Sequence, residues 1–141
     1  MQKKDKILDK ILLLIPSLIL IDQIVKYIFI DKIILVKNFP IILFQKNTGV
    51  AFSLLQNQNI FLVLVNLFII FLLVYLYFKN INMRLGLILM ISGALSNTLD
   101  RIFYGYIIDF INFGFWPVFN LADAFASVGL IIIVIQLIKE K

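Results

Sequence analysis

The sequence predicts an all-α integral membrane protein with four transmembrane helices and a small extracytoplasmic β-sheet between the first two helices. Of its 141 residues, 62% are hydrophobic and 15% are charged, against roughly 25% charged residues in an average globular domain. The mean hydropathy of +1.05 indicates that the surface is apolar as well as the interior. No repeat, low-complexity tract or linker interrupts residues 1–141, so we expect a single domain.

Four apolar segments have about the 20 residues that a helix needs to cross the hydrocarbon core. The first contains Asp22 and Lys26 and has no small-residue cleavage site after it, so it is interpreted as an uncleaved helix. The second has Asn66 among Leu, Ile, Val and Phe and is interpreted as lipid-facing scaffold. The third contains Gly86 and Gly93, which permit close helix contact. The expected spans are approximately residues 11–30, 60–78, 85–102 and 118–138.

Two segments lie outside the spans on the same side. Residues 31–59 alternate β-branched and polar residues before the turn-like Asn47-Thr48-Gly49, which predicts a short sheet. The second segment, about residues 103–117, is rich in aromatic residues and Gly. Its Phe113, Phe115 and Trp116 suit a membrane–water interface.

The basic residues predict which side faces the cytoplasm. Eight of the thirteen lie at the N-terminus, in the turn between the second and third spans, and at the C-terminus: Lys3, Lys4, Lys6, Lys10, Lys79, Arg84, Lys139 and Lys141. The positive-inside rule makes this side cytoplasmic, with both termini, and places the sheet outside. Because the basic residues form no stripe, we expect no nucleic-acid partner.

The residue types narrow the possible chemistry. The chain contains no Cys and no His, which excludes disulfides, Cys-based zinc sites, thiol nucleophiles and imidazole bases. We therefore expect no metal and no cofactor. Carboxylates remain the main candidates for acid–base work, and a Ser-Lys pair that uses Ser53 stays open on composition.

Ionisable residues in or near the spans require an explanation, because an unpaired charge at the bilayer centre costs roughly 2.5 kcal/mol or more. Asp22 and Lys26 lie four residues apart on one helical face, where each can neutralise the other. Asp100 is followed directly by Arg101, and Asn97 lies within one turn of both. This second group is interpreted as a polar clamp.

Two further carboxylates are stronger candidates for function. Asp109 lies in an outer segment among apolar neighbours, Ile-Ile-Asp-Phe-Ile. Asp123 lies about five residues inside the fourth span, roughly 8 Å below its outer end, with Asn120 on the same face. Asp100, Asp109 and Asp123 all map to the outer boundary, so two of them could meet.

Two adjacent carboxylates that share one proton can do aspartic-protease chemistry, in which the ionised group activates a water. The alternative is that the Asp residues only pair with Arg101, Lys26 or backbone amides. Another class, a small proton-coupled transporter or channel subunit with structural Asp/Lys pairs, would continue polar residues across the whole membrane. Here the cytoplasmic halves of the spans are apolar.

The chain resembles the bacterial lipoprotein signal peptidases, the type II signal peptidases, over nearly its whole length. Five blocks occur in the order found in that family: residues 22–26 (DQIVK), 47–52 (NTGVAF), 93–101 (GALSNTLDR), 108–110 (IDF) and 119–123 (FNLAD). Each block alone is a weak pattern, but five in order across four spans form a specific one.

The resemblance implies an intramembrane aspartyl endopeptidase that removes signal peptides from diacylglyceryl-modified prolipoproteins, cutting on the N-terminal side of the lipidated Cys. It implies Asp109 and Asp123 as the catalytic pair, an active site near the extracytoplasmic face of the bacterial cytoplasmic (inner) membrane, and a monomer whose partners are the substrate and the bilayer. The positions that it marks as substrate-binding or site-supporting are Asp22, Lys26, Asn47, Gly49, Asn97, Asp100, Arg101 and Asn120.

The sequence departs from the family pattern in three places. Ser96 stands where Gly is usual, which we expect to change the packing of the third helix, and Ile108 stands where Val is usual. Only thirteen residues separate Asp109 from Asp123, which is short for the family and predicts reduced gating of the substrate.

Overall fold

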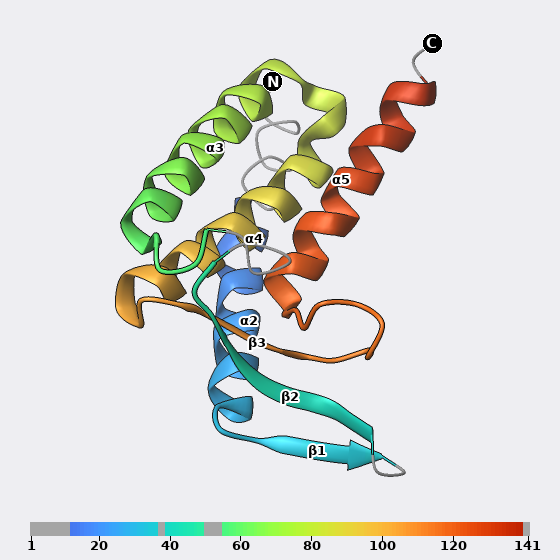
Figure 1. Ribbon diagram of the computed structural model, residues 1–141. Helices are drawn as coiled ribbons and strands as arrows, with labels where there is room; N and C mark the ends of the chain where they lie inside the picture. Colours follow the sequence, from blue (N-terminus) through green and yellow to red (C-terminus); the bar gives the residue numbers. More distant parts are fainter. Residues whose placement is uncertain (1–11, 37–38, 50–54, 140–141) are drawn as a thin grey trace.

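The computed structural model describes residues 12–36, 39–49 and 55–139, and this part of the chain is mostly helical (Figure 1). Its long helices are α2 (Leu14–Phe29), α3 (Asn59–Lys79), α4 (Arg84–Phe103) and α5 (Leu121–Lys139), with a 3-10 turn η2 (Ile81–Met83) between α3 and α4. The strands are β1 (Ile33–Val36), β2 (Phe39–Asn47) and β3 (Ile107–Ile111).

The helices α3, α4 and α5 are each long and apolar enough to cross a membrane. They match the expected spans at 60–78, 85–102 and 118–138 to within three residues at each end. Helix α2 has 16 residues, about 24 Å of helix, which is less than a full span. Because residue 11, the start of the expected first span, lies outside the described residues, the fourth transmembrane helix stays a prediction.

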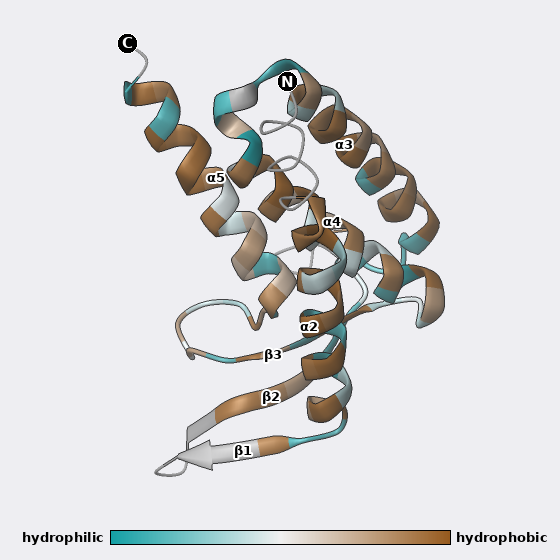
Figure 2. Cartoon of the chain, turned by 180° about the vertical axis from the view of Figure 1, so that it is seen from behind, coloured by the Kyte–Doolittle hydropathy of each residue, from teal (hydrophilic) through white to brown (hydrophobic). Residues whose placement is uncertain are grey.

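Helix α4 is the centre of the bundle and packs against α2, α3 and α5. A cluster of buried apolar side chains joins it to α3: Leu73, Tyr77, Leu87, Ile88 and Ile91. The outer faces of α3 and α5 are exposed and strongly hydrophobic, as brown ribbon in Figure 2. That distribution is expected of helices that face lipid.

Asn66 modifies the interpretation of α3 as plain scaffold. Its Nδ2 donates to the carbonyl of Ala94 (3.0 Å) and to Thr98 Oγ1 (2.6 Å) on α4. A polar side chain between two membrane helices holds them together, so Asn66 fastens α3 to α4.

Glycines allow α4 and α5 to approach closely; the sequence predicts close helix contact at Gly86 and Gly93 but not which helix makes it. A Cβ on Gly86 would lie 2.7 Å from the carbonyl oxygen of Gly129, and a Cβ on Gly129 would lie 2.5 Å from that of Gly86. Further along, Gly93 faces the backbone of Ala122. The N-terminal end of α5, which carries Asp123, is therefore held directly against α4.

The sheet is antiparallel, with strand order β1-β2-β3. Its first two strands lie within residues 31–59, where the alternation pattern predicts a sheet. The third strand was not predicted: β3 comes from the 107–111 segment and places Asp109 opposite Gln45 of β2. Strand β3 also packs on α2 and α4, so Asp109 lies between the sheet and these helices.

Three of the basic residues that the sequence places on one side, Lys79, Arg84 and Lys139, lie at the end of the molecule opposite the sheet, whereas Lys46 lies in β2 itself. Figure 1 shows the sheet at one end and both the α3–α4 connection and the C-terminal end of α5 at the other. Lys79, Arg84 and Lys139 are in the second group. The cytoplasmic location of the termini stays a prediction, because the remaining basic residues of this group lie outside the described residues: Lys3, Lys4, Lys6, Lys10 and Lys141. Ser53, the candidate for a Ser-Lys pair, also lies outside them.

Candidate active site

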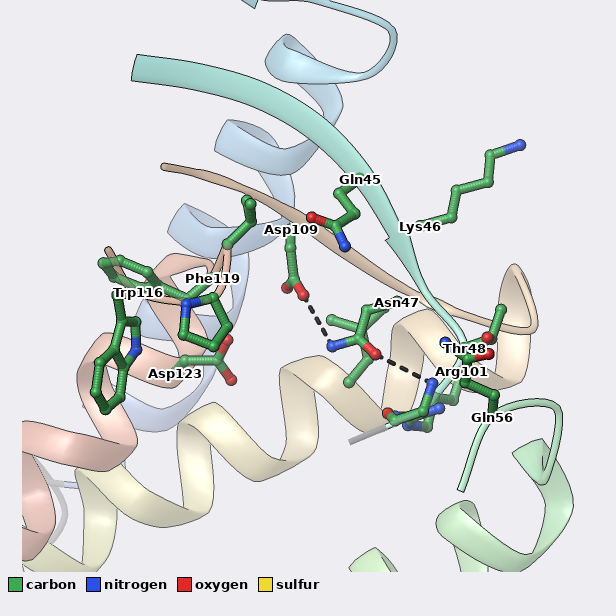
Figure 3. A pocket seen from close by; sticks show the side chains of 14 residues that line it. Gln45, Lys46, Asn47, Thr48, Gln56, Arg101, Asp109, Trp116, Phe119 and Asp123 are labelled. Atoms are coloured by element: carbon green, nitrogen blue, oxygen red, sulfur yellow. Dashed lines mark hydrogen bonds between the residues drawn. The ribbon is translucent and has the colours of Figure 1, made fainter. Parts of the chain in front are cut away.

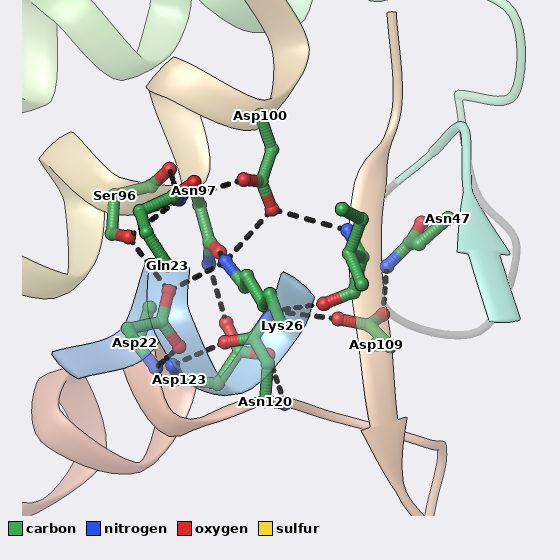
Figure 4. A network of polar contacts seen from close by, with 12 residues as sticks. Asp22, Gln23, Lys26, Asn47, Ser96, Asn97, Asp100, Asp109, Asn120 and Asp123 are labelled. Carbon is green, nitrogen blue, oxygen red and sulfur yellow. Dashed lines mark hydrogen bonds and ion pairs between the residues drawn. The ribbon is translucent and has the colours of Figure 1, made fainter. Parts of the chain in front are cut away.

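Asp109 lies in the middle of β3, where its side chain is almost fully buried. Two amides donate to its carboxylate: Asn47 Nδ2 to Oδ2 at 2.9 Å and Asn120 Nδ2 to Oδ1 at 2.7 Å (Figure 4). Asn47 comes from the end of β2, and Asn120 precedes α5. Two segments other than its own strand therefore fix this carboxylate.

The pKa of Asp109 is raised to about 7, and the largest cause is burial, which removes the carboxylate from water. The nearby carboxylate of Asp123 contributes to this rise, since two like charges close together are unfavourable. The hydrogen bond from Asn47, the positive charge of Lys26 and the hydrogen bond from Asn120 oppose the rise only in part. Asp109 is thus able to hold a proton near neutral pH.

Asp123 lies in the first turn of α5, closer to the helix end than expected. The sequence prediction of five residues and roughly 8 Å was wrong, because the helix begins at Leu121 and Asp123 is only about 3 Å along its axis. Asn120 and Asp123 cap the helix reciprocally: Asp123 N donates to Asn120 Oδ1 (2.9 Å) and Asn120 N donates to Asp123 Oδ2 (3.2 Å).

Asp109 and Asp123 line the same open cavity of about 600 Å³ (Figure 3). Asn120 connects the two residues, since its Nδ2 donates to Asp109 and its Oδ1 accepts from the backbone of Asp123. Other walls of the cavity come from β2, α4 and the loop before α5, including Gln45, Asn47, Gly49, Arg101, Trp116 and Phe119. The structure therefore brings together two candidate carboxylates at one open cavity.

Lys26 is the centre of a buried cluster behind the cavity. Its ammonium lies 2.7 Å from Asp22 Oδ2, 2.7 Å from Asp100 Oδ2 and 2.9 Å from Asn97 Oδ1. The i, i+4 pair of Asp22 and Lys26 expected from the sequence is present. Asp22 also accepts from Ala122 N at the start of α5, at 2.9 Å. This cluster joins α2 to α4 and α5.

Asp100 pairs with Lys26 and not with Arg101, so the expected local clamp was wrong in its partner. Adjacent residues on a helix point about 100° apart, which turns Asp100 and Arg101 to different neighbours. Asp100 Oδ1 accepts from Gln23 Nε2 (2.8 Å), and its Oδ2 accepts from Ile108 N (3.1 Å). Asp100 does not belong to the described residues that line the cavity.

Arg101 instead turns toward the cavity wall. Its guanidinium donates to the carbonyl of Gly49, and its own carbonyl accepts from Asn59 Nδ2 at 2.9 Å. Gly49 N in turn donates to Asn47 Oδ1 (3.1 Å), which forms the turn that the sequence predicts there. Arg101 thereby holds the β2 end, and with it Asn47, beside Asp109.

The sequence analysis missed three polar residues of this network. Gln23 donates to Asp100 and to Ser96 Oγ (3.0 Å), Ser96 Oγ donates to Asp22 Oδ2 (2.6 Å), and Asn59 holds Arg101. Gln23 and Ser96 lie inside blocks that the sequence analysis had singled out. The Ser96 hydroxyl adds a direct link between α4 and Asp22.

A second hollow of about 320 Å³ lies beside the first and is mostly apolar. It lies between α3, α4 and α5, and both Asp123 and Arg101 border it as well as the first cavity. Its walls include Leu62, Val65, Ile69 and Met90. A cavity of mixed polarity at the sheet and an apolar hollow among the helices therefore meet at Asp123.

The loop before α5 exposes three aromatic side chains, Phe113 (54%), Phe115 (86%) and Trp116 (58%). Phe113 stacks on Phe115, and Trp116 also lines the cavity. Exposed aromatic residues next to the end of an apolar helix are typical of the membrane–water interface. Their exposure agrees with the position expected from the sequence.

Because Trp116 is the only Trp in the chain, its fluorescence reports on this loop alone. In nanodiscs, we expect lipids brominated near the headgroup to quench Trp116 more strongly than lipids brominated at the chain ends, since Trp sits at the interface. The measurement is steady-state emission, with unbrominated nanodiscs as the control. Equal emission in all three lipids would place the loop in water and contradict the prediction.

The fold and the site define a small helical membrane protein with two carboxylates, the buried Asp109 and the half-buried Asp123, at the end that bears the sheet. Residues 14–139 match the model of the family described as signal peptidase (SPase) II. The chain belongs to this family of membrane peptidases, which process lipoproteins.

Curated relatives agree with this assignment. The chain is similar to the lipoprotein signal peptidase of Halothermothrix orenii, with 36% identity over 87% of this chain and 91% of the relative. It is 37% identical to that of Thermodesulfovibrio yellowstonii over 87% and 90% of the two chains. A solved bacterial membrane enzyme superposes with a TM-score of 0.82 at 30% identity, over 94% of this chain and 89% of its own.

Proposed function

We propose that this chain is an aspartyl endopeptidase that removes signal peptides from diacylglyceryl-modified prolipoproteins, cutting on the N-terminal side of the lipidated Cys. The observation that carries the proposal is the approach of Asp109 and Asp123 at one cavity, joined by Asn120. The blocks that supply these residues are those of the lipoprotein signal peptidase resemblance. The catalytic unit comes from one chain, which supports a monomer.

The two carboxylates divide the work of hydrolysis. One is ionised and removes a proton from water, which then attacks the scissile carbonyl carbon. The other carries the shared proton and donates a hydrogen bond to the carbonyl oxygen, where negative charge develops. No covalent intermediate on the protein is required.

The position of the site suits a substrate that is anchored in lipid. We place the sheet on the extracytoplasmic side of the bacterial inner membrane and complete a fourth span with residues 11–30. A diacylglyceryl group holds the substrate Cys at the outer interface, close to Asp123, so much of the positioning precedes the chemistry. The apolar hollow beside Asp123 offers room for hydrophobic parts of the substrate.

The test is cleavage of a purified diacylglyceryl-prolipoprotein by the purified protein in detergent, read as a gel shift with and without EDTA. We expect release of the signal peptide at equal rates in both, because the mechanism uses carboxylates alone. The unlipidated precursor is the matched control and should stay intact. Folded protein that cuts neither form would refute the proposal and favour the transporter class.

The raised pKa of Asp109 predicts the alkaline limit of activity. With the shared proton assigned to Asp109, the carboxylate whose pKa is raised to about 7, activity is present below about pH 7 and falls as the pH rises through this value. The hydrogen bond from Asn47 lowers this pKa, so Asn47→Leu should move the alkaline limb of kcat/KM upward. Gln45→Leu, on the same cavity wall, is the control. An unmoved limb in Asn47→Leu would contradict the assignment.

A further inference from the structure

The Lys26 ammonium is enclosed by the buried cluster behind the cavity. A lysine ammonium has three donors and no acceptor. Here all three are directed to oxygen, on Asp22, Asp100 and Asn97. The side chain is 1% exposed. Lys26 is therefore a fixed and fully paired cation, and a single side chain, Asn97, connects it to Asp123.

This cation determines how the Asn97 amide is turned. Only an oxygen can face the donors of Lys26, so Oδ1 of Asn97 points to the ammonium and Nδ2 must point away. Nδ2 then donates to Asp123 Oδ1 at 2.7 Å. Asn97 Oδ1 also accepts a hydrogen bond from Asn120 Nδ2 at 3.1 Å, and this second contact fixes the orientation of the Asn97 amide.

The other oxygen of Asp123 faces a donor as well. Asp123 Oδ2 accepts from the backbone N–H of Asn120, and the residue lies in the first turn of α5, where the helix dipole favours negative charge. Asp109 has amide donors too, but it lies on a strand and neither donor is backed by a cation within hydrogen-bond distance: Asn47 Oδ1 accepts from a backbone N–H, and so does Asn120 Oδ1.

We infer that Lys26 is a positioning residue that acts through Asn97 to keep Asp123 ionised, so that Asp123 activates the water and Asp109 carries the proton. The inference rests on the proposed function and assigns the roles within its pair. The charged groups that interact with Asp123 are Asp22 and Lys26 of α2, Arg101 of α4 and Asp109 of β3. Asp100 of α4 pairs with Lys26, and Lys46 of β2 lies on the cavity wall.

The first experiment removes the ammonium without changing the charge of the cluster. In Lys26→Met/Asp100→Asn, one positive and one negative charge are lost together. We expect the acidic limb of the kcat/KM profile to move up by about 1 pH unit, because a hydrogen bond to a charged group is worth about tenfold in ionisation. Asp100→Asn alone keeps the bond from Lys26 to Asn97, and its limb should not move up.

A conservative variant separates positioning from folding. Lys26→Arg keeps the charge and supplies only donors, so it should retain the acidic limb of the wild type even where its rate is lower. Rates that fall equally at every pH in Lys26→Met/Asp100→Asn would reduce Lys26 to a structural role and overturn the inference. The same upward shift in Asp100→Asn would overturn it too.

A second readout does not depend on turnover. Infrared spectra of protein with 13C-labelled Asp carboxyls show whether a carboxyl is protonated. At mildly acidic pH we expect a protonated band in the wild type that Asp109→Asn removes and Asp123→Asn retains. If the bands show the reverse pattern and the wild type still cleaves, the inference is overturned and the proposed function stands. If the bands show the expected pattern but the wild type does not cleave, the proposed function alone is refuted.

Discussion

Replacement of Asp109 or Asp123 by Asn is expected to lower prolipoprotein cleavage by about 10³-fold or more, since each variant removes one half of the acid–base pair. The loss should appear in kcat and not only in KM, because the carboxylates act on the reacting atoms. Asn occupies nearly the same volume as Asp, so the buried site keeps its shape. The measurement is the initial rate of the gel-shift assay, with thermal unfolding of each variant to verify folding.

Two controls give the result its meaning. Asp31→Asn changes an exposed carboxylate at a position with φ of 58°, a conformation that Asn adopts readily, and should leave the rate unchanged. Asp100→Asn alters the Lys26 cluster but not the cavity wall, so it should retain measurable activity. An inactive Asp100→Asn beside an active Asp109→Asn would exchange the roles of these two residues and refute our assignment.

The sequence predicted the helices well because the bilayer imposes their length. Segments of about 20 apolar residues have few alternatives in lipid, and α3, α4 and α5 follow the predicted limits closely. A close helix contact of α4 was also predictable, though not its partner α5, since Gly86 and Gly93 have few other uses inside an apolar helix.

The sequence analysis failed where contacts join distant parts of the chain. Strand β3 pairs with a strand more than 60 residues earlier, and a five-residue segment with a central Asp gives no local signal of that pairing. Asp100 was assigned to its sequence neighbour Arg101, whereas its partner Lys26 comes from another helix. The depth of Asp123 depended on the cap at Asn120, which the apolar pattern does not show.

The sequence predicted which residues belong to the candidate site but not which of them form hydrogen bonds with one another. The sequence pointed to Asp109 and Asp123 as unexplained carboxylates at the outer boundary, and the five blocks supplied the supporting residues. Which amide faces which carboxylate depends on donors and acceptors from α2, β2 and α4 together. That information exists only once these elements are packed.

Gly93→Ala is expected to reduce both stability and activity, because α5 has no room to receive a methyl group. The added Cβ would overlap the carbonyl of Ala122, a backbone atom that cannot rotate away. Overpacking of this kind costs about 1–3 kcal/mol of unfolding free energy. The displaced residue precedes Asp123 directly, and its N–H donates to Asp22, so the shift reaches both the proposed catalytic pair and the buried cluster.

A displacement of about 1 Å at a catalytic group can lower the rate by about 10²-fold, and we expect a loss of that size in kcat for Gly93→Ala. Gly105→Ala is the matched control: its φ is 80°, which strains the backbone, but no atom lies within 4 Å of the added Cβ. It should lose some stability and keep nearly full activity. If both variants kept full activity in the gel-shift assay, the prediction would be wrong. The contact of Gly93 with Ala122 would then not be needed to position Asp123 beside Asp109, and the Asn120 cap would position it alone.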